Sequence, residues 1–244
     1  MKHDLPLTGE RTVPGVPHEN YWFRRHEAAY QALTAYCRDR VVLEAGAGEG
    51  YGAAMLAHVA RKVIALDYDE PTCVHAARTY PELAVARGNL AALPAADASV
   101  DVVACLQVIE HLWDQPGFVA ECHRVLRPGG RLLITTPNRL TFSPGTDAPV
   151  NPFHTREFSH AELVELLEPD FGVAVTLGVR HGEWLRTLDA GYGGSLVDAQ
   201  LGTPAEEWPD TLRDDVASLT SKDFVMSADD LDSCLDLVVV ALPR

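Results

Sequence analysis

The chain has 244 residues, 47% of them hydrophobic, which suits one large α/β domain spanning residues 1–244. Its formal net charge of −15 disfavours nucleic-acid partners and anionic membrane surfaces, because both require a basic footprint on the protein. Five cysteines without a CxxC spacing indicate free thiols in a reducing compartment, so we expect a cytoplasmic protein that binds neither nucleic acid nor membranes.

The first half of the chain alternates between predicted strands and predicted helices. Residues 1–25 form an arm rich in proline, glycine and charge, and apolar residues at helical spacing then predict a helix over residues 21–36. Short apolar runs predict five strands, at residues 41–43, 63–66, 83–86, 100–108 and 131–136. Helices are predicted between them, at residues 53–60 and 70–79, and a further helix that closes over residues 121–126. This alternation is typical of a buried, mostly parallel sheet flanked by helices.

The pattern changes after Pro137. Residues 138–158 form a proline-rich loop, Ser159 or His160 opens a helix that ends at Leu167, and a strand is expected around residues 173–179. Residues 181–230 are polar and acidic, and they precede a last strand over residues 235–242. A long insertion in a compact domain is usually a lid, a binding loop or an interface. We therefore expect residues 181–230 to cover the site or to offer the surface of a homodimer.

A glycine cluster follows the first predicted strand, with the sequence Gly46-Ala47-Gly48-Glu49-Gly50. Glycine permits positive φ angles and a close approach of the backbone to a ligand, and the next helix presents free N–H groups. Asp67 ends the second predicted strand, where an acid accepts hydrogen bonds from ribose hydroxyls. These features predict an adenosine-containing ligand. The glycine spacing differs from the G-x-G-x-x-G pattern of NAD-binding domains.

Together with four further segments, this cluster resembles the family of class I S-adenosylmethionine (SAM)-dependent methyltransferases, of the type 11/12 kind. The segments that carry the resemblance, in the family's order, are residues 42–50, 63–69, 88–94, 99–111 and 126–134. The resemblance implies a Rossmann-like α/β fold with a seven-stranded, mostly parallel sheet, an antiparallel last strand and flanking helices. It also implies SAM as the methyl donor and S-adenosylhomocysteine as the product.

The resemblance assigns cofactor contacts to the ends of the first two strands. The backbone of Gly46 and Gly48 would line the methionine part of SAM, with Glu44 near its amino group. Asp67 would bind the ribose diol, and Tyr68 would lie against the adenine ring.

Further cofactor contacts are expected from three other segments. Asn89 and the backbone of Leu90 would meet the adenine edge. Many relatives carry Asp where this chain has Asn89, but an amide oxygen still accepts a hydrogen bond. Gln107, at the end of the fourth strand, is also expected to contact the cofactor. Tyr21 and His26 belong to the aromatic and basic arm, which either folds over the cofactor or only staples the first helix.

Three histidines are candidates for chemistry on the acceptor. His111 follows the carboxyl end of the fourth strand, so it is the first candidate for a general base, unless it only caps a loop. His154 is the second candidate, and Arg156 nearby either holds a polar substrate group or pairs with Glu157. His181 is a third candidate for substrate contact.

A metal ion is also considered, because the fourth motif resembles that of ubiquinone-pathway O-methyltransferases, in which two carboxylates and a histidine hold a divalent cation. Glu110 and His111 match two of these positions. Gln107 occupies the place of the first carboxylate, and an amide is a poorer ligand for a hard cation. We therefore expect no required metal.

The whole chain looks like an actinobacterial subgroup associated with methylated polysaccharides such as the methylglucose lipopolysaccharides. This suggests O-methylation of a sugar or an oligosaccharide, in which Asp189 and Asp198 either bind hydroxyls or lie on the solvated surface. The alternatives are methylation of another small molecule, of quinone or natural-product type, and a catalytically silent SAM-binding regulator. A nicotinamide-dependent oxidoreductase would need the other glycine spacing.

Overall fold

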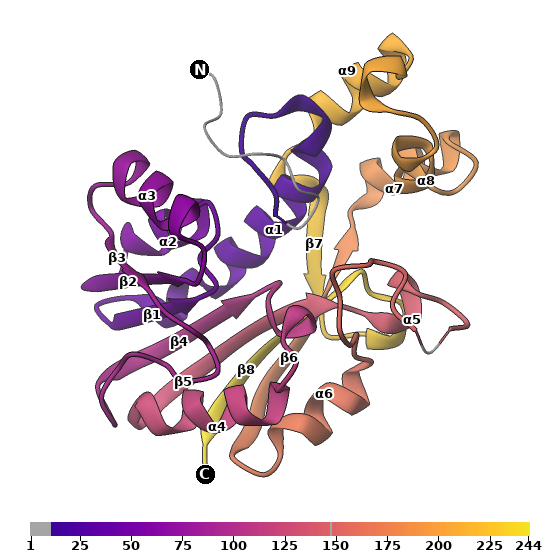
Figure 1. The fold of residues 1–244 in the computed structure, drawn as a ribbon. Coiled ribbons are helices and arrows are strands. Elements are labelled where there is room, and N and C mark those ends of the chain that lie inside the picture. The colour runs from indigo at the N-terminus through magenta and orange to yellow at the C-terminus, as the bar shows by residue number, and fades with distance from the viewer. Residues whose placement is uncertain (1–10, 147) are drawn as a thin grey trace.

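In the computed structural model, which describes residues 11–146 and 148–244, eight strands form one sheet (Figure 1). The strands are β1 (Val41–Ala45), β2 (Lys62–Asp67), β3 (Ala84–Arg87), β4 (Val100–Leu106), β5 (Leu126–Pro137), β6 (Phe171–His181), β7 (Phe224–Ser227) and β8 (Asp236–Pro243). Their order across the sheet is β3-β2-β1-β4-β5-β8-β6-β7. The first five strands in this order are parallel, and β8 is antiparallel to both of its neighbours.

The predicted parallel sheet and its antiparallel last strand are confirmed, but the sheet has one strand more than the expected seven. The additional strand is β7, which pairs with β6 at the edge of the sheet and lies inside the acidic insertion. An edge strand of four residues is paired on one side only, so it needs no continuous apolar run. For this reason the periodicity of the sequence did not indicate it.

Nine α-helices connect the strands in the described part of the chain. They are α1 (Asn20–Leu33), α2 (Tyr51–Ala57), α3 (Glu70–Thr79), α4 (Gln115–Val125), α5 (Arg139–Phe142), α6 (His160–Leu167), α7 (Glu183–Gly191), α8 (Leu196–Leu201) and α9 (Asp210–Ser218). The predicted start of α6 is confirmed by a capping box between Ser159 and Glu162. None of the described helices combines the length and the hydrophobicity that a membrane span requires.

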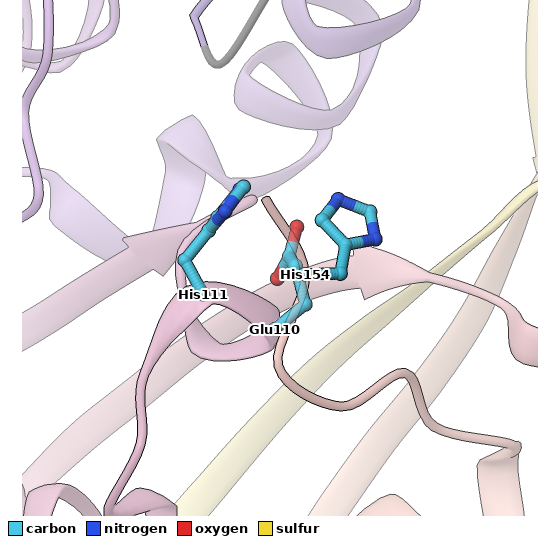
Figure 2. A group of neighbouring side chains, drawn as sticks. All are labelled: Glu110, His111 and His154. Carbon is cyan, nitrogen blue, oxygen red and sulfur yellow. The ribbon is translucent and has the colours of Figure 1, made fainter. Parts of the chain in front are cut away.

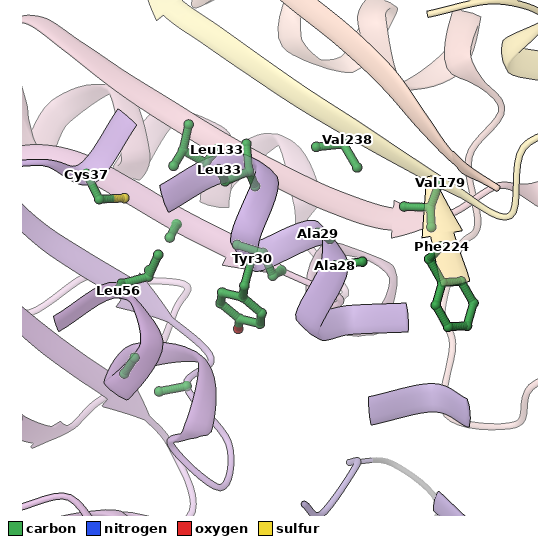
Figure 3. Packing of buried hydrophobic residues seen from close by; sticks show 14 of the residues in the cluster. Ala28, Ala29, Tyr30, Leu33, Cys37, Leu56, Leu133, Val179, Phe224 and Val238 are labelled. Atoms are coloured by element: carbon green, nitrogen blue, oxygen red, sulfur yellow. The ribbon is translucent and has the colours of Figure 1, made fainter. Parts of the chain in front are cut away.

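Buried side chains form two hydrophobic clusters, one on each face of the sheet. Leu33 of α1 and Leu56 of α2 belong to the first cluster, which also contains Leu133 of β5 (Figure 3). Phe118 of α4 belongs to the second cluster, together with Leu132 of β5. Adjacent residues of one strand point to opposite faces, so β5 contributes to both clusters. The continuous apolar strands of the sequence are thereby explained.

The insertion and the arm meet beside α1. Helices α7, α8 and α9 pack around the first cluster, and the Asn20 side chain donates to the carbonyl oxygens of Val216 and Leu219 at the end of α9. The ring of His18 contacts the edge of Trp208 in the insertion. The first ten residues of the predicted arm lie outside the described residues.

Candidate active site

The sheet reverses its order of connection between β1 and β4. From β1 the chain passes to β2 and β3 on one side, and it then crosses over to β4 on the other side. Ligands of open α/β sheets bind at the carboxyl ends of the strands that flank such a reversal. The glycine loop follows β1 and Gln107 follows β4, so the two lie at this point.

Residues 46–50 form a tight loop that glycine alone accommodates without strain. Gly46 and Gly48 have φ angles of 82° and 53°, which residues other than glycine rarely adopt. The amides of Gly46 and Ala47 both donate to the carbonyl oxygen of Leu66, which ties the loop to β2. A Cβ atom on Gly46 would lie 2.6 Å from a methyl group of Val108, so the loop packs directly against the residues that follow β4.

Glu44 of β1 is a buried carboxylate with one unsatisfied oxygen. Glu44 is only 1% exposed, and the hydroxyl of Tyr30 donates to its Oε1 at 2.6 Å. Oε2 is buried and has no hydrogen-bond partner in the structure. Burial raises the pKa of Glu44 to about 8, and the hydrogen bond from Tyr30 opposes this rise. A protonated amine next to Oε2 would supply the missing donor, so this position fits the amino group of SAM.

Asp67 connects the glycine loop to the end of β2. Its Oδ2 accepts a hydrogen bond from the Gly48 amide at 2.8 Å, and its Oδ1 accepts one from the Asp69 amide at 3.0 Å. Each carboxylate oxygen can accept a further bond, so both remain suited to ribose hydroxyls. Tyr68, the next residue, is 62% exposed, as expected of a ring that covers a ligand rather than the core. The cofactor contacts of Asp67 and Tyr68 stay predictions.

The predicted adenine-edge residues lie after β3. The side-chain oxygen of Asn89 accepts a hydrogen bond from the Ala91 amide at 2.9 Å, which shapes the turn, and Leu90 is buried in the second hydrophobic cluster. Gln107 has a positive φ of 56°, and its side chain donates to the Thr135 hydroxyl at 3.2 Å. The hydrogen bond to Thr135 helps to keep Gln107 at the end of β4 in this strained backbone conformation. Gln107 also lines the adjoining cleft.

A cleft of about 820 Å³ opens at the segments that follow β4 and β5, and its volume falls in the range typical of small-molecule sites. The predicted site residues that line it are Tyr21, His26, Gln107, His111, His154 and His181, together with Asp189 and Asp198 of the insertion. Arg156 is not among the lining residues, because its guanidinium lies over the ring of Phe158. The expected substrate contact of Arg156 therefore has no support in the cleft geometry.

Glu110, His111 and His154 converge at the floor of this cleft (Figure 2). Glu110 and His111 belong to the 3-10 turn Ile109–His111 that follows β4, whereas His154 lies on the loop that follows β5. The two imidazole rings meet edge to face, with centroids 4.9 Å apart. Oε2 of Glu110 accepts a hydrogen bond from the Thr136 hydroxyl, and burial raises the pKa of Glu110 to about 8.

His154 is held by a residue that the sequence did not single out for chemistry. Its Nδ1 lies 2.7 Å from Oε1 of Glu157, and both side chains are almost completely buried. The tautomer that donates from Nδ1 to this carboxylate leaves Nε2 as the acceptor atom, which faces the amide nitrogen of Asn151 at 3.1 Å. Glu157 thus pairs with His154, three residues earlier, instead of the adjacent Arg156. An acid three residues after a candidate histidine was the available signal for this pair.

The arm residues Tyr21 and His26 are engaged within the protein. The Tyr21 hydroxyl lies 2.7 Å from Nε2 of His181, which connects α1 to the end of β6. Nδ1 of His26 lies 3.1 Å from the hydroxyl of Tyr51, the first residue of α2. Burial lowers the pKa of His26 to about 4 and also lowers that of His181, so both rings are neutral near pH 7.

Comparison with known proteins agrees with this geometry. Residues 43–134 match the model of a family described as "Methyltransferase domain". The chain is 57% identical to a "Probable S-adenosylmethionine-dependent methyltransferase" of Mycolicibacterium smegmatis, over 98% of this chain and 95% of that protein. A protein of Mycobacterium tuberculosis with a name of the same kind is 54% identical, over 98% and 89% of the two chains.

Solved structures of other methyltransferases share the fold. The crystal structure of a "SAM-dependent methyltransferase, possible histamine N-methyltransferase" from Thermotoga maritima superposes with a TM-score of 0.63 at 17% identity. The superposition covers 94% of this chain and 96% of the Thermotoga maritima chain. At this identity the likeness shows the fold alone.

Proposed function

Because the chain belongs to the family of class I SAM-dependent methyltransferases, we propose that it methylates a hydroxyl group of a sugar or an oligosaccharide in polysaccharide biosynthesis. The observation that carries this proposal is one cleft that holds a carboxylate–histidine cluster together with Gln107, whose neighbour Val108 packs against the glycine loop. SAM, when bound, supplies an electrophilic methyl group on a sulfonium. The residues of the chain must then align a nucleophilic oxygen with that methyl group and promote the loss of its proton.

The donor side of the site is formed by the ends of β1 and β2. Oε2 of Glu44 is placed to accept from the amino group of SAM, and Asp67 is placed to accept from its ribose hydroxyls. The glycine loop packs against Val108, which follows the cleft residue Gln107. The donor and acceptor sides are therefore contiguous, as an in-line transfer of a methyl group requires.

The acceptor side favours a hydroxyl-bearing substrate. Deprotonation of the acceptor is placed at the cluster that contains His111 and His154, since imidazole is the side chain best suited to accept a proton near neutral pH. Asp189, Ser195 and Asp198 of the insertion line the same cleft. Carboxylate and hydroxyl oxygens accept hydrogen bonds from the several hydroxyl groups of a sugar, which supports a polyhydroxylated acceptor.

The proposal is tested with radiolabelled SAM and a panel of acceptors that contains glucan and mannan oligosaccharides, a quinol and a phenol. We expect label in the oligosaccharides, and none with Asp67→Ala, whose binding of SAM should collapse in calorimetry. The exposed Asp97→Ala variant serves as the matched control. Transfer of label to the quinol or phenol alone would overturn the sugar acceptor, and failure of the wild-type protein to bind SAM would overturn the cofactor assignment.

We further propose a cytoplasmic location. All five cysteines are free and buried in the structure, as is typical of proteins in a reducing compartment. Cell fractionation with an antibody to the chain tests this location, and recovery in the culture medium would contradict it.

A further inference from the structure

The cluster at the floor of the cleft has the composition of a metal site. Glu110, His111 and His154 each offer one ligand atom, and these three atoms lie within 4.8 Å of one another. Their side chains come from two loops and point toward a common position (Figure 2). We propose that these three residues bind one divalent cation.

Both imidazoles are oriented in the way that metal-binding histidines usually are. Nδ1 of His154 is anchored by the Glu157 carboxylate, and Nδ1 of His111 lies 3.0 Å from the carbonyl oxygen of Phe153. Histidines that bind metals almost always donate the other ring N–H to a carboxylate or a backbone carbonyl. In this tautomer Nε2 carries the lone pair of each ring, so Nε2 is the ligand atom in both. The Asn151 amide, which faces Nε2 of His154, would give way to the cation.

The balance of charge at this position also favours a cation. Glu110 and Glu157 are both buried, and the ion pairs of the described residues join neither of them to a lysine or an arginine. Oε2 of Glu157 is buried without a hydrogen-bond partner in the structure. Ionised buried carboxylates need a positive partner, and a divalent ion bound by Glu110 and by the imidazole of His154, which Glu157 holds, would supply one.

The donor set indicates which cations fit. Two imidazole nitrogens and one carboxylate suit Zn²⁺, Mn²⁺ or Fe²⁺, whereas Ca²⁺ and Mg²⁺ prefer oxygen ligands. The expectation of no metal depended on Gln107, which stands in the place of a carboxylate in the motif. His154 supplies the third ligand from the loop after β5, which the motif alone did not show.

The cation gives the cleft a defined chemical role, and this part of the inference rests on the proposed function. Three protein ligands leave a coordination position that opens into the cleft, as in catalytic metal sites. With the cation bound, the two imidazoles would be ligands instead of proton acceptors. The cation would lower the pKa of an acceptor hydroxyl in that position, and the proton would pass to water at the mouth of the cleft. The cation would then hold the oxygen that receives the methyl group.

The binding of Mn²⁺ tests the site without any assay of activity. The chain is prepared without a histidine tag, stripped with EDTA and titrated with Mn²⁺, and free Mn²⁺ is followed by electron paramagnetic resonance. We expect one equivalent to bind, with competition by Zn²⁺. Glu110→Gln, His111→Asn and His154→Asn should each weaken binding by about tenfold or more. The matched control is His160→Asn, at the start of α6.

Three outcomes separate the possibilities. Binding that is weakened in the ligand variants and kept in the control supports the site. Absence of stoichiometric binding, or binding that no ligand variant changes, overturns it; if Glu110→Gln fails to fold, the two histidine variants decide. Mn²⁺ binding by a chain that methylates no sugar would leave the cation site standing and overturn the proposed function.

Discussion

The hydroxyl of Tyr30 reaches Oε1 of Glu44 at 2.6 Å because residue 52 has no side chain. A Cβ atom on Gly52 would lie 2.1 Å from Cζ of Tyr30, so any larger residue would displace the ring. Helix α1 thus contributes a buried tyrosine that fixes one oxygen of the carboxylate. The other oxygen, Oε2, is left for a ligand.

Replacement of Tyr30 by phenylalanine is predicted to weaken SAM binding by about tenfold, because a hydrogen bond to a charged group contributes about 1.5–3 kcal/mol. Isothermal titration calorimetry measures the change. Tyr192→Phe is the matched control, since the Tyr192 hydroxyl donates to Asp215 at 2.7 Å within the insertion. Equal affinities of the two variants would contradict the role of Tyr30.

The affinity for SAM is predicted to rise with pH up to about 8. Burial raises the pKa of Glu44 to about 8, so the free protein holds this carboxyl mostly protonated at pH 7, whereas the ammonium group of SAM favours the ionised form. The dissociation constant should therefore fall by up to about tenfold per pH unit from pH 6 toward pH 8, and rise again at higher pH, where the α-amino group of SAM loses its proton near its ordinary pKa of about 7.7–8.0. Calorimetry over this range, with Glu44→Gln as the control, checks the slope; the same slope in both proteins would exclude Glu44 as its source.

The raised pKa of Glu44 favours SAM binding at higher pH, but it makes the folded chain more stable at lower pH. The pKa of Glu44 is higher in the folded chain than its ordinary value of 4.5, so the folded protein binds more protons between the two values. The contribution of Glu44 to the free energy of unfolding is therefore complete below about pH 4.5 and is lost as the pH rises through about 8. Urea unfolding of the wild type and Glu44→Gln at several pH values would reveal this difference.

Glu157→Gln is predicted to lower kcat by about 10- to 100-fold with little change in KM for the acceptor. The glutamine keeps the shape of the side chain but weakens the hold on Nδ1 of His154, and the loss of such an orienting partner typically has this size. Steady-state kinetics on the best acceptor measure both constants. Exposed Glu165→Gln is the control, and an unchanged kcat in Glu157→Gln would show that the pair is structural only.

The Arg25–Asp236 pair anchors α1 to β8, and its disruption should be severe. Two nitrogens of Arg25 donate to the two oxygens of Asp236, and both side chains are buried. Arg25→Met leaves the buried carboxylate unpaired, which costs about 3–5 kcal/mol. The exposed pair of Arg61 and Asp101 offers a control, because Arg61→Met should cost less than about 1 kcal/mol. Chemical denaturation measures both, and similar losses would refute the distinction.

Arg11→Ala is predicted to speed the dissociation of SAM by about three- to fivefold. Arg11 donates to the Thr72 hydroxyl at 2.9 Å and lies near Asp69, so the arm is attached to α3 at one end and to the insertion through Asn20 at the other. Stopped-flow fluorescence measures the rate. Arg213→Ala, which breaks the exposed Arg213–Asp210 pair in the insertion, should leave it unchanged.

Much of the donor side could be predicted from the sequence, because its residues follow strands that carry their own hydrophobic pattern. The glycine loop, Asp67 and Tyr68 each come directly after such a strand, and parallel strands bring their carboxyl ends to one edge. The contact of Tyr30 with Glu44 was not predictable in this way. It depends on how α1 packs over the sheet, and helical spacing alone does not specify the partner of a buried ring.

The acceptor side was predicted less completely, because its residues come from loops. His111 and His154 were each expected near the site, but their contact depends on the path of residues 138–158, which has no periodicity. The expected role of Arg156 depended on its proximity to His154 in sequence. Its guanidinium instead lies over Phe158, since adjacent residues in an irregular loop need not face the same side.

The two edges of the sheet constrain how copies of the chain could associate. The edge strand β3 has four residues, whereas at the opposite edge β7 pairs only with Gly178–His181, so residues 171–177 of β6 have no described strand on that side. Short edge strands are one way in which proteins discourage the joining of sheets into larger aggregates. A homodimer of this chain would therefore not form through the β3 edge, and it would have two other surfaces to use, the side chains of the insertion and the backbone of residues 171–177.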